Sequence, residues 1–271
     1  MKSLKTIIRS IQALKPIADD CHIYGCMGAA RIALSRVFPK LAKMPKEMSA
    51  NRKITGGTKV WIRTGTSDRN VFEQIFCWNE LKVEFQKKQV DWIIDAGANV
   101  GFSTVWFANH FPNSRVLAIE PDLGNFLALQ KNIKRFEPRV VALNAAVWDA
   151  DAELQLSSET FRDGREWSRQ FVQTKTGSQF QTTMSVPGFT LDSIVSEYRI
   201  PQIGILKLDV EGAETVIFKA GGRWLSKTSL IIAELHRDSS FGDPTPYFYQ
   251  ALQGQFDVSI QGERFIASRS S

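Results

Sequence analysis

Apolar runs that end in an acidic residue recur along most of the chain. The first extends from Val90 to Asp95 and is followed by a glycine loop, and the second covers residues 115–121. Short runs that are apolar throughout are typical of strands buried on both faces of a sheet. They alternate with stretches of helical spacing over residues 101–111 and 123–136. This alternation predicts an α/β fold with a doubly wound, mostly parallel sheet.

The same alternation continues to the C-terminal end. Further strands are predicted over residues 139–149, 152–156, 203–209 and 229–236. Further helices are predicted over residues 190–198, 212–225 and 246–255, the first of them capped by Thr190. Residues 256–267 show two strand-like runs around Gln261-Gly262, which is typical of a hairpin. We therefore expect a Rossmann-like, seven-stranded sheet with an antiparallel strand at its edge.

The N-terminal 60 residues differ from the rest in charge and pattern. They carry 12 Lys and Arg against 3 Asp and Glu, whereas the remaining residues are net acidic. Residues 4–20 have helical apolar spacing that Pro16 is expected to interrupt, and residues 30–48 form a second basic amphipathic stretch. We expect residues 1–60 to form a helical appendage and residues 61–271 to form the main domain. The appendage either packs on that domain or contacts a partner such as an anionic membrane.

Composition narrows the function classes. The hydrophobic share of 43% is that of an ordinary globular protein. The acidic balance of the main domain argues against a nucleic-acid partner, which favours basic working domains. Three widely spaced cysteines form no disulfide framework, and neither a signal peptide nor a long apolar span is visible. We expect a cytoplasmic protein, with membrane association through the basic N-terminus left open.

The loop in DWIIDAGANVGFST lies where a parallel sheet binds its ligand. A dinucleotide site favours G-x-G-x-x-G, but this loop has only Gly97 and Gly101, and Asp95 at its head would repel a pyrophosphate. An acid there suits an ammonium group, and Glu120 at the next strand end could bind both ribose hydroxyls. Together these residues predict S-adenosylmethionine as the cofactor. The alternative is a tight turn without a ligand.

The order of six segments resembles the FkbM family of methyltransferases. The segments are DAGANVGFSTVWFA, AIEPD, ALNAAVWD, TLDSIV, LKLDVEGAE and LIIAELH, and the similarity covers roughly residues 60–240. KLDVEGAE is the most specific of them. The resemblance implies S-adenosylmethionine-dependent methyl transfer, usually to a hydroxyl oxygen of a sugar or polyketide. It also implies a set of cofactor-binding residues: Asp95, Ala96, Gly97, Ala98, Asn99, Gly101, Glu120, Pro121, Ala146 and Val147.

Three residues are candidates for catalysis. An alcohol acceptor must lose its proton near the transition state, so a positioned base is expected. His236 ends a predicted strand and has a suitable pKa range, and Asp209 and Glu211 follow the neighbouring strand. A structural histidine, and acids that complement a helix N-terminus, are the alternatives. These residues with Glu234 could also bind a Mg²⁺-like ion, a less favoured reading.

The acceptor is expected to be a small molecule or a glycan. Residues 157–185 form a long polar segment with Trp167 and several arginines, and they are predicted to be an acceptor-binding loop or a surface loop. O-methylation is the favoured reaction. An N-methyltransferase of a small molecule, and a non-catalytic binding protein that retains the fold, remain as alternatives.

Overall fold

The computed structural model describes the chain in five stretches: residues 2–37, 44–83, 90–156, 171–173 and 185–270. The chain divides into two compact units, Met1–Glu80 and Leu81–Ser271. The first unit therefore extends beyond the basic segment that composition sets apart. Most of the predicted acceptor-binding loop lies outside the described residues.

The first unit begins with helix α1 (Lys2–Val37), which bends at Gly25. Gly25 has a φ of 72°, a conformation that glycine adopts without strain. The interruption expected at Pro16 is therefore wrong, because the helix continues through this residue and the bend lies at Gly25. Buried Asp20 lies 3.1 Å from Arg36 and 2.5 Å from Arg69, so ion pairs hold the bend together.

Two short strands and a short helical segment complete the first unit. Strand β1 (Glu47–Ser49) pairs antiparallel with β2 (Trp61–Arg63), and α2 (Asp68–Phe72) continues into the π-helical turn η1 (Glu73–Cys77). Strand β1 lies at the end of the stretch predicted to be a basic amphipathic helix, so that prediction is wrong there. Met48 is instead buried opposite Ile62 in the strand pair.

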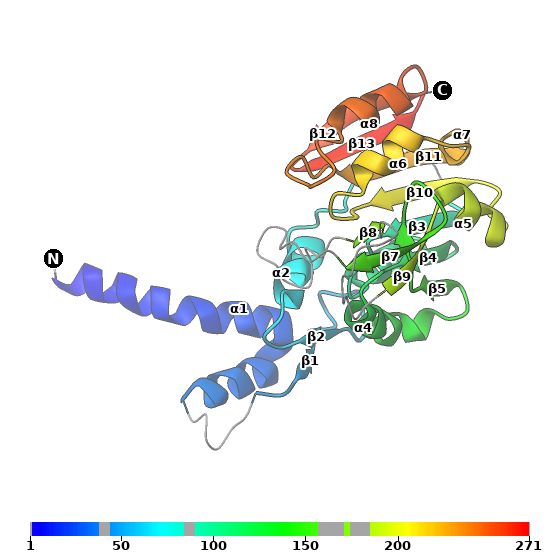
Figure 1. Ribbon diagram of the computed structural model, residues 1–271. Coiled ribbons are helices and arrows are strands. Elements are labelled where there is room, and N and C mark those ends of the chain that lie inside the picture. The colour runs from blue at the N-terminus through cyan, green and yellow to red at the C-terminus, as the bar shows by residue number, and fades with distance from the viewer. Residues whose placement is uncertain (1, 38–43, 84–89, 157–170, 174–184, 271) are drawn as a thin grey trace. The chain divides into compact units, whose positions relative to one another are not determined.

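The second unit is built around a seven-stranded sheet of order β12-β13-β11-β10-β3-β4-β5 (Figure 1). Its strands are β3 (Trp92–Ala96), β4 (Arg115–Ile119), β5 (Val140–Leu143), β10 (Ile203–Leu208), β11 (Thr228–Glu234), β12 (Phe256–Gln261) and β13 (Arg264–Arg269). Strand β3 pairs parallel with both β4 and β10. The strand order reverses here, which places the expected ligand site at the carboxyl ends of β3, β4 and β10. The predicted doubly wound, mostly parallel sheet is confirmed.

The antiparallel strand is not the outermost one. Strand β13 pairs antiparallel with both β11 and β12, and β12 forms the edge of the sheet. The predicted antiparallel strand is present, but it is the second strand from the edge and not the edge strand itself. Burial gives the reason, because Phe265, Ile266 and Ala267 of β13 are buried whereas most of β12 is not.

A second, smaller sheet has the order β6-β9-β7-β8. It contains β6 (Ala146–Val147), β7 (Ala152–Leu156), β8 (Phe171–Gln173) and β9 (Ser185–Phe189). The single strand predicted over residues 139–149 is therefore wrong, because the chain leaves the main sheet after Leu143. Between β5 and β6, the Asn144 side chain donates hydrogen bonds to the main-chain oxygens of Glu120 and Pro121, at 2.8 and 3.1 Å.

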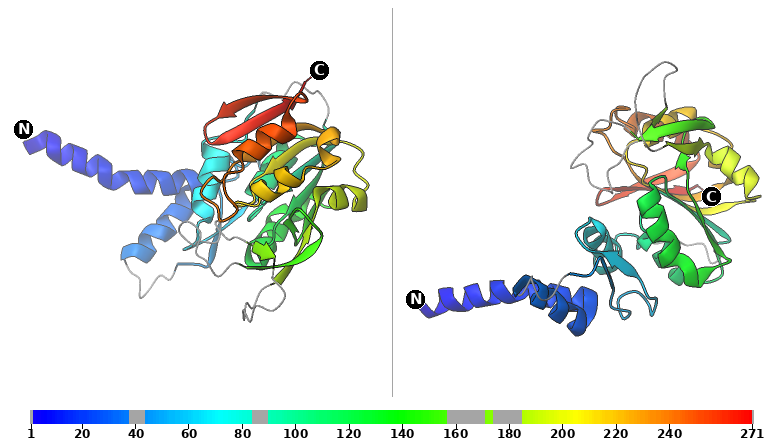
Figure 2. Two further views of the ribbon diagram at one scale, coloured as in Figure 1. Left: turned by 45° about the horizontal axis from the view of Figure 1, so that its top comes forward. Right: turned by 60° about the horizontal axis from the view of Figure 1, so that its bottom comes forward.

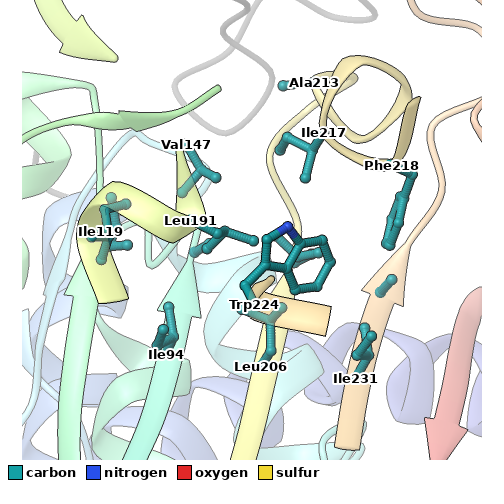
Figure 3. Packing of buried hydrophobic residues seen from close by; sticks show 14 of the residues in the cluster. Ile94, Ile119, Val147, Leu191, Leu206, Ala213, Ile217, Phe218, Trp224 and Ile231 are labelled. Carbon is teal, nitrogen blue, oxygen red and sulfur yellow. The ribbon is translucent and has the colours of Figure 1, made fainter. Parts of the chain in front are cut away.

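Helices cover both faces of the main sheet, as the two views in Figure 2 show. They are α3 (Phe102–His110), α4 (Leu123–Ile133) with the 3₁₀ turn η2 (Lys134–Phe136), α5 (Leu191–Glu197), α6 (Glu214–Ala220), α7 (Trp224–Lys227) and α8 (Thr245–Leu252). Trp224 lies in the core on one face, among side chains of the sheet and of α5 and α6 (Figure 3). Ile93 and Val116, whose side chains point to the opposite face, are also buried. In the described part of the chain, no helix is long and apolar enough to cross a membrane.

Candidate functional site

The glycine loop follows β3 and is held against the ends of both neighbouring strands. The N–H groups of Gly97 and Ala98 both donate to the main-chain oxygen of Ile119, at 3.0 Å. Gly97 has a φ of 76°, and a Cβ on it would lie 1.7 Å from the main-chain oxygen of Asp209. Gly101, with a φ of 87°, would place a Cβ 2.6 Å from Leu129. Both glycines are therefore required by the packing of the loop itself.

Asp95 is buried beneath this loop rather than exposed at its surface. Its Oδ2 accepts hydrogen bonds from Ser103 and Thr104, at 2.7 and 2.6 Å. Its Oδ1 lies 3.3 Å from the ammonium of Lys207. The sequence-based argument that Asp95 would meet a ligand ammonium directly is not supported by this burial. In this structure Asp95 orients the start of α3 and the loop.

Lys207 is a buried lysine that the sequence analysis missed. Its Nζ donates to the main-chain oxygen of Gly97 at 2.9 Å and lies 3.4 Å from Oδ2 of Asp209. Burial alone would lower its pKa, but the carboxylates of Asp95 and Asp209 outweigh burial and raise the pKa of Lys207 above its ordinary value. The ammonium therefore stays charged and joins the ends of β3 and β10. A lysine within the apolar run GILKLD was the available signal.

Glu120, at the end of β4, is buried and binds the loop. Its Oε2 accepts the Asn99 N–H at 2.8 Å, and its Oε1 accepts the Asp122 N–H at 2.9 Å. Burial raises the pKa of Glu120 to about 7, although hydrogen bonds from Asp122 and Asn99 lower it. Oε1 also accepts from the Asn125 side-chain amide at 3.5 Å, so the acceptor capacity left for a ligand lies mainly at Oε2. The predicted position of Glu120 beside the glycine loop is thus observed.

The other residues predicted to bind the cofactor differ in what they can offer. Ala96, Ala98, Ala146 and Val147 have buried side chains, so contacts from them would be made through main-chain atoms. Ala146 and Val147 lie in the second sheet, and Pro121 follows Glu120 and is partly exposed. Asn99 has a φ of 50° and its Oδ1 accepts the Val100 N–H at 2.7 Å.

Four carboxylates surround the imidazole of His236, and we call this group the acidic ring. It consists of Asp209, Glu211, Glu214 and Glu234. Three of them face Nε2 of His236, with oxygens at 3.3 Å for Glu234, 3.6 Å for Glu211 and 3.9 Å for Asp209. The structure therefore brings together the three residues that the sequence analysis selected for catalysis.

His236 is itself inaccessible, with 1% of its side chain exposed. Its Nδ1 lies 2.8 Å from Oε1 of Glu214, which also accepts the Val210 N–H at 3.0 Å. Burial alone would lower its pKa, but the hydrogen-bonded carboxylates of Glu214 and Glu234 raise the pKa of His236 to about 11. This burial and charge do not fit the neutral general base that the sequence predicted. The contact between His236 and Glu214 was not predicted, because the two residues are 22 positions apart in the chain.

Asp209 is the most exposed member of the acidic ring, with 32% of its side chain accessible. Burial would raise its pKa, but Lys207, His236 and Arg264 together lower the pKa of Asp209 below its ordinary value. Asp209 follows β10 directly, and its main-chain oxygen lies against Gly97 of the glycine loop. It therefore lies where the glycine loop and the acidic ring meet.

Comparison with known proteins identifies the family. A family model described as "Methyltransferase FkbM domain" matches residues 95–256, more than half of the chain. The chain therefore belongs to the FkbM family of methyltransferases, and the predicted family is confirmed. The crystal structure of methyltransferase FkbM from Methylobacillus flagellatus shares the fold, with a TM-score of 0.50, 16% identity, and 97% of this chain and 60% of that chain covered. The fold is that of the class I methyltransferases.

Two curated relatives match part of the chain. The 2-O-methyltransferase NoeI of Sinorhizobium fredii is 25% identical over 182 residues, which cover 64% of this chain and 72% of NoeI. AMB antimetabolite synthetase AmbE of Pseudomonas aeruginosa is 23% identical over 209 residues, which cover 64% of this chain. Those residues span only 10% of AmbE.

Proposed function

We propose that the protein transfers a methyl group from S-adenosylmethionine to a hydroxyl oxygen of a glycan or secondary-metabolite acceptor. The observation that carries this proposal is the buried Glu120 carboxylate, which holds the glycine loop and faces no cation within the described contacts. Oε2 of this carboxylate has one described hydrogen bond and can accept another from a ribose hydroxyl. The family membership and the name of the NoeI relative support the same reaction class.

The donor would be held by residues of three strand ends. Glu120 would bind the ribose, and the main chain from Gly97 to Gly101 would border the methionine part. Pro121, Ala146 and Val147 would border the adenine. S-adenosylmethionine supplies an activated methyl group, so the protein has mainly to position the acceptor oxygen in line with it. The negative charge of the acidic ring, close to Gly97, favours a cationic sulfonium over a pyrophosphate.

The acceptor would bind over the acidic ring. Its oxygen forms a bond to the methyl carbon while the bond from that carbon to sulfur breaks, and the electron pair goes to sulfur. The products are a methyl ether, S-adenosylhomocysteine and a proton. The proton is taken up by a ring carboxylate, of which Asp209 is the most exposed at 32%. His236 orients the ring and balances its charge.

Calorimetry tests the donor site with the full-length chain. S-adenosylmethionine and S-adenosylhomocysteine should bind with one site per chain, and NAD should not bind. Glu120→Gln should weaken binding roughly ten- to a hundredfold, since a hydrogen bond to a charged acceptor is worth about 1.5–3 kcal/mol. Glu153→Gln is the matched control, because Glu153 is exposed on β7. Binding of NAD in place of both nucleosides would contradict the proposal.

A further inference from the structure

The imidazole of His236 is oriented by a carboxylate on the side away from the rest of the acidic ring. Glu214 is fully buried, and its Oε1 accepts from both the Val210 N–H and Nδ1 of His236. The proton on Nδ1 is therefore fixed, and Nε2 is directed at the other carboxylates. Histidines that bind metals commonly donate their second ring N–H to a carboxylate in this way. The hydrogen bond to Glu214 therefore orients the imidazole of His236, whatever the number of other carboxylates around it.

The atoms that face each other across the ring are mostly acceptors. Nε2 of His236 is opposed by oxygens of Glu234, Glu211 and Asp209 at 3.3, 3.6 and 3.9 Å. A proton on Nε2 can be directed at one oxygen at a time, and only the Glu234 oxygen is within ordinary hydrogen-bond reach. Two other cations act on the ring: the Lys207 ammonium, which is shared between Asp95 and Asp209, and Arg264, which is registered with Glu234 across β11 and β13. A cation at the centre of the ring would satisfy several of these groups together.

The spacing of the ring fits one ion. Ligand atoms of Asp209, Glu234 and His236 all lie within 4.8 Å of one another. An ion bound at about 2.0–2.3 Å from each ligand keeps those ligands about 3–4.5 Å apart. We propose that a divalent cation binds at the carboxyl ends of β10 and β11 in place of the Nε2 proton of His236, with Asp209, Glu234 and the neutral His236 as its ligands. Glu211 lies beside them and adds negative charge.

The ligand set indicates the kind of ion. Carboxylates favour Mg²⁺ and Mn²⁺, while one imidazole is compatible with Mn²⁺ and later transition metals. Three protein ligands leave coordination positions for water and for an acceptor hydroxyl. A bound cation lowers the pKa of a hydroxyl coordinated to it, so that a weak base such as a carboxylate can remove its proton. This catalytic part rests on the proposed function, whereas cation binding itself does not.

Electron paramagnetic resonance of Mn²⁺ tests the binding. The full-length chain is dialysed against a chelator and then titrated with Mn²⁺, and the signal of free Mn²⁺ is measured. The wild-type chain should remove one equivalent from solution. Asp209→Asn and Glu234→Gln should each weaken binding at least tenfold, and Glu214→Gln should weaken it about 10- to 100-fold through the imidazole. Glu263→Gln, which removes an exposed acid in the β12–β13 turn, should bind as the wild type does.

The outcomes separate this inference from the proposed function. Thermal melting without metal shows whether each variant is folded, and a folded Glu234→Gln variant that binds Mn²⁺ as tightly as the wild type would overturn the site. So would a wild-type chain that removes no Mn²⁺ at millimolar concentration. Calorimetry with S-adenosylhomocysteine is measured on the same samples. Nucleoside binding without Mn²⁺ binding refutes only the cation site, and Mn²⁺ binding without nucleoside binding refutes only the proposed function.

Discussion

Replacement of Lys207 by methionine should destabilise the second unit strongly. The Lys207 ammonium lies 3.3 Å from Asp95 and 3.4 Å from Asp209, and it donates to Gly97 at 2.9 Å. Without it, Ser103 and Thr104 are the hydrogen-bond donors that the described part of the chain leaves to the fully buried Asp95 carboxylate. Removal of one partner of a buried ion pair costs about 3–5 kcal/mol. For a domain of roughly this size, that corresponds to a fall in Tm of about 6–20 °C.

Thermal and urea unfolding of the full-length chain measure this loss. Lys82→Met, at an exposed position of the second unit, is the control and should change stability by less than about 0.5 kcal/mol. Asp95→Asn in the Lys207→Met background should recover at least about 1 kcal/mol, because the uncompensated charge is then removed. The reasoning fails if Lys207→Met costs less than about 1 kcal/mol, or if the double variant is no more stable than the single one.

Three further predictions concern the donor loop and the N-terminus. Because burial raises the pKa of Glu120 to about 7, calorimetry should show that the affinity for S-adenosylmethionine falls as the pH drops below 7. The contribution of Glu120 to the free energy of unfolding should change in the opposite direction, decreasing as the pH rises from the pKa of Glu120 in the unfolded chain toward 7. Gly97→Ala should cost more than about 3 kcal/mol in urea unfolding, while Gly262→Ala, also at positive φ but with open space, should cost about 1–2 kcal/mol. Residues 1–60 carry 12 basic against 3 acidic side chains, so the chain should pellet with anionic vesicles at low salt. It should not pellet at high salt or with neutral vesicles. Equal pelleting under all these conditions would contradict the prediction.

The main sheet could be predicted because its signals are local. Buried parallel strands are short apolar runs, and the acids that end β3 and β4 mark the edge where ligands bind. The second sheet could not be predicted in the same way. Its strand β9 pairs parallel with β6 and antiparallel with β7, which lie about 30–40 residues earlier in the chain. No local pattern specifies such partners.

The sequence predicted that the candidate catalytic residues lie together, but it could not predict their surroundings. The sequence placed His236, Asp209 and Glu211 together because neighbouring strand ends meet at one edge. It could not show that His236 is buried between Glu214 and the other carboxylates, because burial and charge environment depend on packing. The roles of Asp95 and Lys207 were missed for the same reason, since their ion pair joins residues far apart in the chain.

A crystal structure of the full-length chain with S-adenosylhomocysteine tests the central claim most directly. The account predicts that the ribose diol lies within hydrogen-bond distance of the Glu120 carboxylate and that the amino acid part follows the loop from Gly97 to Gly101. The sulfur should face the acidic ring, with Asp209 on that side. A nucleoside bound away from Glu120, or with its sulfur directed away from Asp209, would contradict both the donor site and the acceptor position proposed for this protein.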